Sequence, residues 1–330
     1  MLPVVYNPGM EKEKRKVVIC VPWLSEEQHE QVGSACLSNG FEPVFFERMP
    51  SGEDIADAEV IFGILPGELL KGAVSLRWMH CPMAGVNIYT DNELFTSGKA
   101  VLSNSNAFGV AIAEHIICVL LMMMRHMGFY RDLVSRRKWG RYSPIDSITG
   151  SRIAVIGTGD IGESFGTRAK AMGAHVVGVR TRNEKPEWCD ELYLTGDMKK
   201  AVSGCDAVVA SLPLTPLTEG IFDREFFAAM KQGSYFVNVG RGPSVDEDAL
   251  IEALKSGHLA GAALDVFVKE PLDEESPLWE TENLLITPHC AGDTALPYTR
   301  QRITDIFVQN MNEYARGEIP SAAVDVKKGY

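Results

Sequence analysis

A glycine-rich turn near the middle of the chain constrains the fold more than any other segment. The apolar run 152–156 predicts a buried strand, and the segment Gly157–Gly162 follows it with the spacing G-x-G-x-x-G. Residues 161–172 then predict a helix, and the apolar run 175–179 predicts a second strand. Glycines cluster in many loops, but a strand before this turn and a helix and strand after it predict a parallel β-α-β unit.

Short apolar runs alternate with polar helical stretches along most of the chain, which indicates parallel sheets covered by helices on both faces. In the first hundred residues the expected strands are 17–21, 44–46, 60–64, 76–79 and 101–103. From the glycine-rich turn onward they are 152–156, 175–179, 206–210, 234–239, 260–264 and 283–286. We therefore expect an α/β fold made of two Rossmann-like domains with parallel sheets.

The two domains are expected to share the chain unequally. The domain with the glycine-rich turn is one continuous segment, 106–295, inserted into a flavodoxin-like domain formed by 1–105 and 296–330. The longest apolar stretch, 107–127, predicts a buried helix, and 294–316 predicts a terminal helix. A cleft between two such domains is the natural place for a ligand site.

The composition excludes several classes of protein. A formal charge of -12, from 44 acidic and 32 basic residues, argues against a nucleic-acid partner, because phosphate binding requires a basic surface. The best membrane candidate, Ile116–Met124, is too short to span a bilayer, and residues 1–16 lack the apolar run of a secretory signal. The seven cysteines form no C-x-x-C pair, so we expect reduced thiols, a cytoplasmic location and no bound metal ion.

The glycine-rich turn predicts a binding site for a dinucleotide, because the helix N-terminus after it offers backbone N–H groups to a pyrophosphate. NAD-binding proteins usually carry an acidic residue at the end of the second strand, where it binds the ribose 2′-hydroxyl. Here Arg180 stands at that position, and Thr181 and Arg182 follow it. An arginine attracts a 2′-phosphate, so we expect NADP as the preferred cofactor. The alternative is that both arginines are solvated and that NAD binds through other contacts.

Four polar side chains follow predicted strands within the same domain. Arg241 comes directly after one strand, Asp265 after the next, with Glu270 five residues later, and His289 follows the last. The carboxyl ends of parallel strands face the ligand crevice, where a guanidinium can clamp a carboxylate and an imidazole can exchange a proton. Each residue alone is more often structural, as a surface ion pair or a capped histidine. Their joint occurrence favours an active site.

These segments and several others make the chain resemble the D-isomer-specific 2-hydroxyacid dehydrogenase family, which includes glyoxylate/hydroxypyruvate reductases. The resemblance covers most of the chain, and its last three motifs in series are specific to the family. The matching stretches are Met83–Asn87, Ala113–Glu114, Gly157–Gly162, Asn238–Gly242, Gly261–Pro271, Pro277–Trp279 and Thr287–Gly292.

The resemblance implies an oxidoreductase that passes a hydride from NADPH or NADH to a 2-keto acid such as glyoxylate or hydroxypyruvate, giving the D-2-hydroxy acid. Arg241 would bind the substrate carboxylate and carbonyl oxygen. His289 would donate the proton, and Glu270 would pair with it and set its tautomer. These three residues are the implied catalytic set.

The resemblance also implies the binding residues. The backbone amides of Ala84 and Gly85 would hold the substrate carboxylate, and Met83 would shape the pocket beside them. Asp265 would contact the nicotinamide. The implied cofactor site comprises Gly157, Gly159, Asp160, Ile161, Gly162, Arg180, Thr181, Arg182, Leu212, Pro213, Val239, Gly240, Asp265, His289, Ala291 and Gly292.

Several alternatives stay open. Glu270 argues against a formate dehydrogenase, in which an amide accompanies the histidine, and Asn87 stands where the family usually has aspartate. A dinucleotide-sensing binding protein of the same fold, or a dehydrogenase for another small anion such as phosphite, would share these motifs. The apolar helix at 107–127 and the basic arm through Trp139 favour a homodimer, and burial against the chain's own first domain is the alternative.

Overall fold

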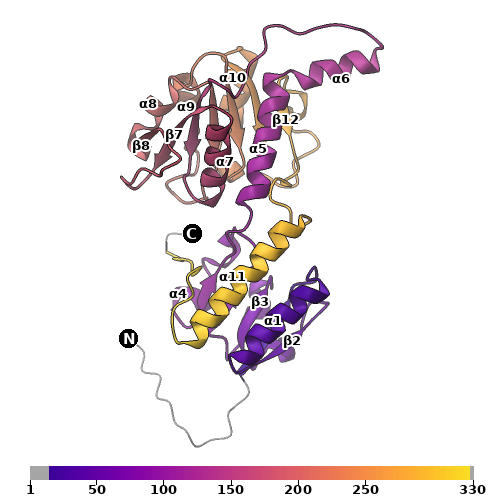
Figure 1. The fold of residues 1–330 in the computed structure, drawn as a ribbon, viewed down its shortest axis with the longest axis vertical. Coiled ribbons are helices and arrows are strands. Elements are labelled where there is room, and N and C mark those ends of the chain that lie inside the picture. Colours follow the sequence, from indigo (N-terminus) through magenta and orange to yellow (C-terminus); the bar gives the residue numbers. More distant parts are fainter. Residues whose placement is uncertain (1–14, 328–330) are drawn as a thin grey trace, which may run out of the picture. The chain divides into compact units, whose positions relative to one another are not determined.

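The computed structural model describes residues 15–327. The chain divides into two compact units, one formed by 1–106 and 297–330 and the other by 107–296 (Figure 1). The boundaries expected from the sequence, after residues 105 and 295, each lie one residue before the observed ones. Each unit has a parallel sheet with helices on both faces, which confirms the expected α/β fold with two parallel sheets.

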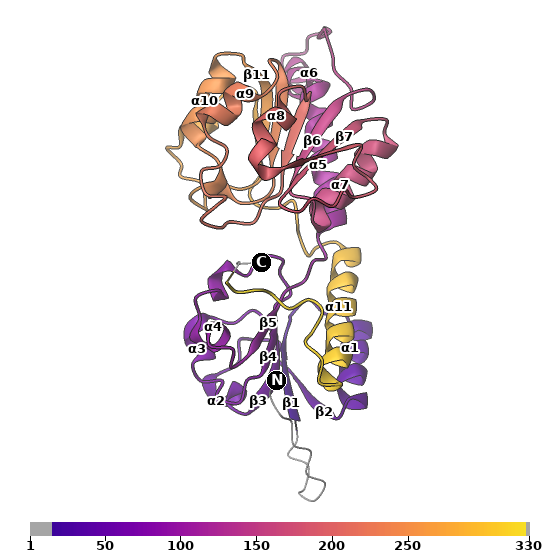
Figure 2. The same ribbon diagram turned by 90° about the vertical axis from the view of Figure 1, so that its left-hand side faces the viewer.

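The first unit has a five-stranded parallel sheet, with strand order β2-β1-β3-β4-β5 among the described residues. This is the order of flavodoxin-like sheets. Figure 2 shows α1 and α11 side by side on one face and α2, α3 and α4 on the other. The strands are β1 (Arg15–Cys20), β2 (Phe41–Phe45), β3 (Ala58–Gly63), β4 (Trp78–His80) and β5 (Val101–Ser103). The helices are α1 (Glu26–Ser38), α2 (Gly52–Ile55), α3 (Gly67–Leu70), η1 (Asn87–Tyr89), α4 (Glu93–Thr96) and α11 (Pro297–Ala315).

Apolar strands and one returning helix build the core of this unit. Val17, Val18 and Ile19 of β1 are at most 1% exposed, as expected for a central strand covered on both faces. Phe307 of α11 stacks on Phe62 of β3, with ring centroids 4.2 Å apart. This stacking attaches the C-terminal helix to the first unit, although the whole second unit lies between these residues in the sequence.

The second unit has a seven-stranded parallel sheet, with strand order β12-β11-β10-β9-β6-β7-β8 among the described residues. If β6 is counted as the first strand, this is the Rossmann strand order with one strand added at the β12 edge. Strands β7 and β8 are added on one side of β6 and β9 to β12 on the other, so the order switches between β6 and β9. Helices α5 and α7 pack together on one face, and α8, α9 and α10 cover the other (Figures 1 and 2). The strands are β6 (Arg152–Ile156), β7 (His175–Arg180), β8 (Glu191–Leu194), β9 (Ala207–Ala210), β10 (Ser234–Asn238), β11 (Leu259–Leu264) and β12 (Leu284–Ile286). The helices are α5 (Gly109–Met124), α6 (Met127–Ser135), α7 (Asp160–Ala171), η2 (Thr195–Asp197), α8 (Met198–Val202), α9 (Arg224–Ala229), η3 (Gly242–Ser244), α10 (Glu247–Lys255) and η4 (Pro277–Glu280).

Strand β8 is absent from the strands expected in this unit. It pairs with β7, and its four residues, Glu-Leu-Tyr-Leu, are half-exposed or exposed, as expected for a strand at the edge of a sheet. Its first residue, Glu191, accepts hydrogen bonds from Arg152 at 2.6 Å and His175 at 2.9 Å. Pairing with β7 and these polar contacts therefore hold this strand in place, more than burial of its short apolar run does.

The single helix expected over 107–127 is wrong in extent. Helix α5 ends at Met124, His126 adopts a left-handed φ of 51°, and α6 continues at 65° to α5. Much of α5 is buried, but Cys118 and Met122 are exposed, and α6 has no buried residue. In residues 15–327 no single helix is long and apolar enough to span a membrane, and only the bent pair α5 and α6 together meets that criterion. The terminal helix begins at Pro297, later than expected, since proline suits the first turn of a helix.

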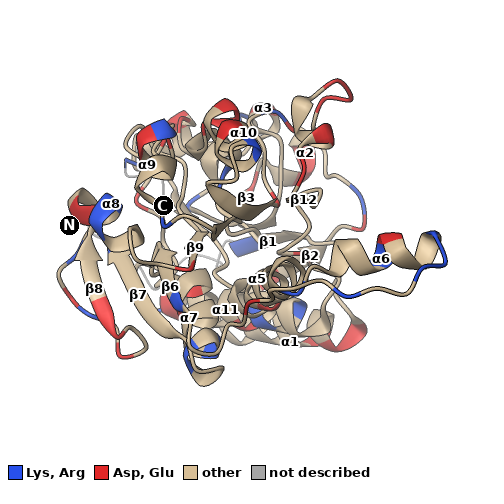
Figure 3. Ribbon diagram, turned by 90° about the horizontal axis from the view of Figure 1, so that it is seen from above, with Lys and Arg blue, Asp and Glu red and all other residues tan. Residues whose placement is uncertain are grey.

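Acidic and basic residues both occur on α9 and on α10 of the second unit (Figure 3). Lys199 pairs with Glu225 at 2.6 Å, and Arg224 pairs with Glu252. Exposed pairs of this kind each stabilise a protein by less than about 1 kcal/mol. The buried apolar core between sheet and helices therefore stabilises the unit more than these surface pairs do.

Candidate active site

Three neighbouring strands of the second unit end beside one another, and each is followed by a predicted catalytic side chain. Strands β10, β11 and β12 are adjacent and parallel, so their carboxyl ends share one edge of the sheet. Arg241 follows β10, Asp265 and Glu270 follow β11, and His289 follows β12. The fold thus gathers at one edge four polar groups that are well separated in the sequence.

The imidazole of His289 and the carboxylate of Glu270 form a hydrogen-bonded pair, with 2.7 Å between Nδ1 and Oε2. The other carboxylate oxygen, Oε1, accepts a hydrogen bond from the backbone N–H of Phe267 at 2.9 Å. An ionised carboxylate only accepts hydrogen bonds, so Nδ1 must carry the proton in this pair. Nε2 is then the atom that can gain or release a proton, which is the arrangement needed for general acid–base chemistry.

Asp265 holds the loop that carries His289. Its Oδ1 accepts hydrogen bonds from the Thr287 hydroxyl at 2.7 Å and from the Cys290 N–H at 2.9 Å. Its Oδ2 accepts one from the Ala291 N–H at 3.0 Å, and the Asp265 residue is only 3% exposed. His289 has a left-handed φ of 52°, which is unfavourable for a residue with a side chain and requires support from its surroundings. The Asp265 carboxylate supplies that support from both sides of the histidine.

Arg241 is held by its own backbone and lies close enough to Glu270 for the two charges to interact. The carbonyl oxygen of Arg241 accepts hydrogen bonds from Asn238 Nδ2 at 3.1 Å and Ser244 Oγ at 2.6 Å. Burial lowers the pKa of its guanidinium, and the nearby Glu270 carboxylate opposes this change by favouring the charged form. Its Nη1 donates to the Gly240 carbonyl at 2.7 Å. The result is a partly desolvated cation at the sheet edge, which can attract an anionic ligand strongly.

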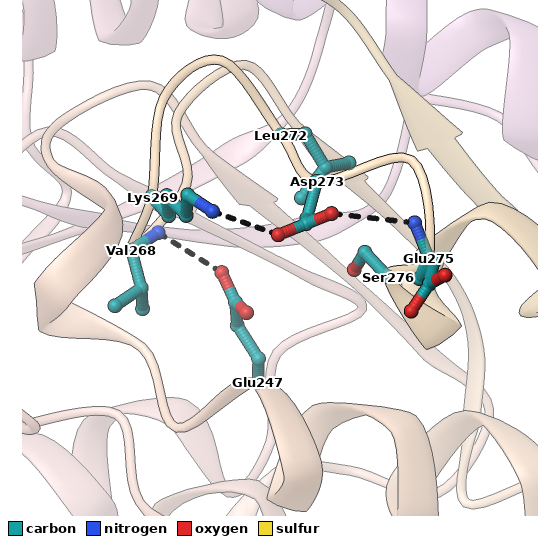
Figure 4. A pocket seen from close by; sticks show the side chains of 7 residues that line it. All are labelled: Glu247, Val268, Lys269, Leu272, Asp273, Glu275 and Ser276. Carbon is teal, nitrogen blue, oxygen red and sulfur yellow. Dashed lines mark hydrogen bonds and ion pairs between the residues drawn. The ribbon is translucent and has the colours of Figure 1, made fainter.

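The loop that carries Glu270 is braced from two directions (Figure 4). The Val268 N–H donates to Glu247 Oε1, at the start of α10, over 3.0 Å. Lys269 pairs with Asp273 at 2.7 Å across the loop. These contacts hold the loop around Glu270 in place. Its carboxylate is therefore already positioned to accept the hydrogen bond from His289.

The three glycines of the turn after β6 have three different physical roles. Gly157 has a φ of 97°, which a side chain rarely permits. A Cβ on Gly162 would lie 2.0 Å from the Gly157 carbonyl oxygen, so this glycine allows α7 to pack against the turn. A Cβ on Gly159 would meet no atom within 4 Å, so nothing in the protein itself demands glycine there. Gly159 also caps α7 without a side-chain hydrogen bond, so its surroundings suit a close-lying pyrophosphate.

Replacement of Gly159 by alanine should separate binding from folding. Alanine is compatible with the Gly159 backbone angles of −80° and −159°, so the thermal midpoint should stay close to that of the native protein. The added methyl group would occupy the space where a pyrophosphate approaches the backbone, and we expect roughly a tenfold or greater rise in the Kd for NADPH. The matched variant Gly162→Ala should instead lower the thermal midpoint, because its methyl group would overlap the backbone. Native cofactor affinity in Gly159→Ala would contradict this assignment.

Most of the other residues predicted for the cofactor lie at the carboxyl ends of β6, β7, β9 and β10, around the reversal in strand order. Arg180 ends β7, and its Nη1 donates to the Glu184 carbonyl at 2.8 Å. The carboxylate of Asp160 accepts a hydrogen bond from the Gly109 N–H at 2.8 Å, so it joins α7 to the start of α5. The remaining predicted residues at these strand ends are Ile161, Thr181, Arg182, Leu212, Pro213, Val239 and Gly240, while Ala291 and Gly292 follow His289. Among residues 15–327, no three His, Cys, Asp or Glu side chains form a cluster suited to a metal ion.

The predicted carboxylate-binding amides belong to the first unit. Met83, Ala84 and Gly85 form the turn after β4, at the carboxyl edge of that unit's sheet. Met83 is 42% exposed, and Ala84 and Gly85 are half-buried. Each unit therefore presents its predicted residues at the carboxyl ends of its own parallel strands, the edge where such sheets bind ligands.

Two residues that support the candidate site, Thr287 and Asn238, are not among the predicted site residues. Thr287 links Asp265 to the histidine loop, and Asn238 binds the backbone on both sides of Arg241 through its amide. Both lie within the quoted segments around His289 and Arg241. Each is a small polar residue at the end of a strand, and this position could have indicated them. A buried polar side chain needs a hydrogen-bond partner, and here the partners are the loops that carry Arg241 and His289.

Comparison with known proteins finds relatives that match most of the chain. The sequence profile of D-isomer specific 2-hydroxyacid dehydrogenase, NAD binding domain, matches residues 117–291. The hydroxypyruvate reductase of Blautia hydrogenotrophica is 30% identical over 274 residues, which cover 80% of this chain and 84% of that protein.

Two crystal structures of bacterial proteins have a similar fold. The D-isomer specific 2-hydroxyacid dehydrogenase of Xanthobacter autotrophicus, in complex with NADPH and MES, has a TM-score of 0.81 at 25% identity, covering 96% of this chain and 100% of that one. The NADPH-dependent glyoxylate/hydroxypyruvate reductase of Sinorhizobium meliloti, in complex with NADP and sulfate, has a TM-score of 0.77 at 25% identity, with the same coverage.

Proposed function

Since the chain belongs to the D-isomer-specific 2-hydroxyacid dehydrogenase family of NAD(P)-dependent oxidoreductases, we propose that it reduces a small 2-keto acid, such as glyoxylate or hydroxypyruvate, to the 2-hydroxy acid, which is the D isomer where the product is chiral. The observation that carries this proposal is the 2.7 Å hydrogen bond between His289 Nδ1 and Glu270 Oε2. With Nδ1 engaged by Glu270, Nε2 is the atom that would give its proton to the substrate, and Glu270 also lies near the partly desolvated Arg241. An acid and a fixed cation are what the reduction of an anionic ketone requires.

The chain's own residues divide the work as follows. Arg241 holds the substrate carboxylate with its fork of N–H groups and draws electron density toward the carbonyl oxygen. The nicotinamide cofactor supplies the hydride when it is bound. As the carbonyl carbon gains the hydride, its π electrons move to oxygen, and His289 gives that oxygen the proton from Nε2. Glu270 stabilises the imidazolium before the transfer, and Asp265 keeps the histidine loop in place.

The substrate proposal is tested by following absorbance at 340 nm with glyoxylate, hydroxypyruvate, pyruvate and phenylpyruvate, each with NADPH and with NADH. Faster oxidation of the cofactor with glyoxylate or hydroxypyruvate than with pyruvate or phenylpyruvate supports the proposal. Tight cofactor binding without turnover of any acid would favour the dinucleotide-sensing alternative, and phosphite would then be tried as a substrate.

We also propose that NADPH is the preferred cofactor. Arg180 stands at the end of β7, where an acidic residue would favour NAD, and Thr181 and Arg182 beside it are exposed. The related proteins of Xanthobacter autotrophicus and Sinorhizobium meliloti were crystallised with NADPH and NADP. Both observations support recognition of a 2′-phosphate by the arginines of this loop.

Replacing Arg180 with aspartate should shift the preference toward NADH. The variant loses a charge-assisted contact with the 2′-phosphate and gains a carboxylate that repels it, so the ratio of kcat/KM for NADPH to that for NADH should fall about 10- to 100-fold. Arg168→Asp on α7 makes the same change of charge elsewhere in the unit and is the matched control, since Arg168 donates to the Ser164 carbonyl of its own helix. An unchanged ratio in Arg180→Asp would remove the basis for the cofactor proposal.

The exposed arm after α5 supports the proposal of a homodimer. Trp139 is 100% exposed, Val134 77% and Met127 48%, so the arm presents apolar side chains that burial against a second copy would remove from water. Sedimentation velocity should give twice the chain mass of 36.3 kDa. A monomer at micromolar concentration would contradict this proposal.

The cysteines support a cytoplasmic location. All seven are unpaired thiols, and four of them are buried in the cores, Cys36, Cys81, Cys189 and Cys205. Thiols persist in reducing compartments. After cell fractionation we expect the protein in the cytosolic fraction, and labelling with a thiol reagent should show that all seven cysteines are reduced.

A further inference from the structure

We propose that Asn104 is a positioning residue for the substrate: its side-chain amide, together with the backbone of Ser105, aims the N–H groups of Ala84 and Gly85 at the carboxylate of the keto acid. The inference rests on the proposed function. It gives a role to a residue that lies outside the motifs quoted above and names the contact through which that residue acts.

Two hydrogen bonds hold the turn after β4 against the segment after β5. Asn104 Nδ2 donates to the Ala84 carbonyl oxygen at 2.6 Å. The Ser105 N–H donates to the Met83 carbonyl oxygen at 3.1 Å. Strands β4 and β5 are parallel neighbours, so the two segments leave the sheet side by side at its carboxyl edge. Two consecutive carbonyl groups of the turn are therefore drawn toward the same segment.

The geometry of the peptide bond converts these contacts into an orientation of donors. In a trans peptide the C=O and the following N–H point in opposite directions. The Met83 carbonyl shares a peptide with the Ala84 N–H, and the Ala84 carbonyl shares the next with the Gly85 N–H; neither peptide is among the cis bonds of the described chain. Holding both carbonyls toward Asn104 and Ser105 thus turns both N–H groups to the other side.

The two N–H groups have no hydrogen-bond acceptor within residues 15–327. Consecutive N–H groups that face one side form a concave site for an anion, because their partial positive charges add. Met83 is exposed and Ala84 and Gly85 are half-buried, so the turn itself is accessible to a ligand. A carboxylate placed there would supply the missing acceptors for both amides.

The clamp itself is rigid. Asn104 is 9% exposed, and its own N–H donates to the Ala322 carbonyl at 3.2 Å. The Ser105 hydroxyl donates to the Cys81 carbonyl at 3.2 Å and lies 3.0 Å from Nε2 of the buried His80. These bonds tie the segment after β5 to β4 and to the C-terminal segment. The position of the Asn104 amide therefore does not depend on the ligand.

The chemistry of the contact distinguishes an amide from a carboxylate. At 2.6 Å from a carbonyl oxygen, a donor is required, and an acceptor of the same shape would be repelled. Asn104→Asp replaces the donor by an oxygen of nearly equal size. The peptide between Ala84 and Gly85 would then be free to rotate, and the amides would lose their common direction.

The test compares Asn104→Asp and Asn104→Ala with the native protein in the KM for glyoxylate, the KM for NADPH, kcat and the thermal midpoint. Losing one or two charge-assisted hydrogen bonds should raise the KM for glyoxylate about 10- to 100-fold. The rise should exceed the fall in kcat, and the KM for NADPH should stay at its native value. Asn104→Ala, which adds no charge, keeps the test decisive if the aspartate variant fails to fold.

Asn39→Asp is the matched control. Asn39 is half-buried in the same unit, just after α1, and its Nδ2 donates to the Ala35 carbonyl at 2.8 Å and to Asn312 Oδ1 at 2.7 Å. This variant should lower the thermal midpoint while leaving the KM for glyoxylate unchanged. If both Asn104 variants keep the native KM for glyoxylate, or if Asn39→Asp raises it equally, the clamp is overturned while the proposed function stands. A native protein that reduces none of the 2-keto acids would overturn the proposed function, and with it the role assigned to Asn104.

Discussion

Replacing His289 with alanine should lower kcat for a 2-keto acid by about 10²- to 10⁴-fold, the range over which general acid–base catalysis contributes. The reason is geometric, because the Glu270 carboxylate holds Nδ1 at 2.7 Å and leaves Nε2 as the proton donor. No other histidine is bonded to a carboxylate at the ends of β10, β11 and β12 in the described part of the chain. The measurement is a steady-state assay with the fastest keto acid of the panel.

Dinucleotide binding provides the control for this prediction. The glycine-rich turn lies after β6, apart from the histidine loop, so a titration with NADPH should still show saturable binding by His289→Ala. His258→Ala is a matched substitution, because His258 directly precedes β11, at the amino edge of the sheet, and contacts the Phe227 and Met230 carbonyls. It should keep the native kcat. A His289→Ala variant with near-native turnover would show that another group supplies the proton.

Replacing Arg241 with alanine should lower kcat/KM for the keto acid by about 10²- to 10⁴-fold, the loss expected from two hydrogen bonds to a charged group. In the proposed mechanism the partly desolvated guanidinium binds the substrate carboxylate in a fork and also polarises the carbonyl group. Lysine at this position keeps the charge but loses the fork, so Arg241→Lys should retain only part of the activity. The measurement is kcat/KM for glyoxylate in both variants, with NADPH saturating.

Arg224→Ala is the matched control for the Arg241 variants. Arg224 forms an exposed pair with Glu252 on α9 and α10, so its loss should leave kcat/KM at the native value. In Arg241→Ala the KM for NADPH should also stay near the native value. If instead the KM for NADPH rises while that for glyoxylate does not, Arg241 serves the cofactor, and the substrate carboxylate must be held by other groups.

Much of the architecture follows from local patterns in the chain. The apolar run 152–156 became β6, and the strands expected at 206–210 and 260–264 were observed within one residue of their predicted limits. Such runs are readable because a strand buried on both faces must be apolar throughout. The positions of Arg241, Glu270 and His289 were readable for a related reason, since a polar residue directly after a buried strand lies at a sheet edge where ligands bind.

Other features depend on contacts that the sequence does not display. Strand β8 forms because β7 offers an edge to pair with, and the break between α5 and α6 at His126 has no proline or glycine to announce it. A strand of only four residues and a helix that is apolar on most sides give no local signal of where the chain pairs or bends. These elements were missed because tertiary pairing outweighed the local hydrophobic pattern.

The chain's sequence alone thus predicted which residues take part in the candidate site, because strand periodicity and glycine spacing are local properties. The tertiary structure decided which contacts those residues make. It alone distinguishes Gly159, whose Cβ would meet open space, from Gly162, whose Cβ would meet backbone. It alone joins Asp265 to the loop of His289, and Asn104 to the Ala84 carbonyl. The hydrogen bonds of Asp265 and Asn104 join residues 25 and 20 positions apart, and such contacts exist only once the strands that precede them lie side by side.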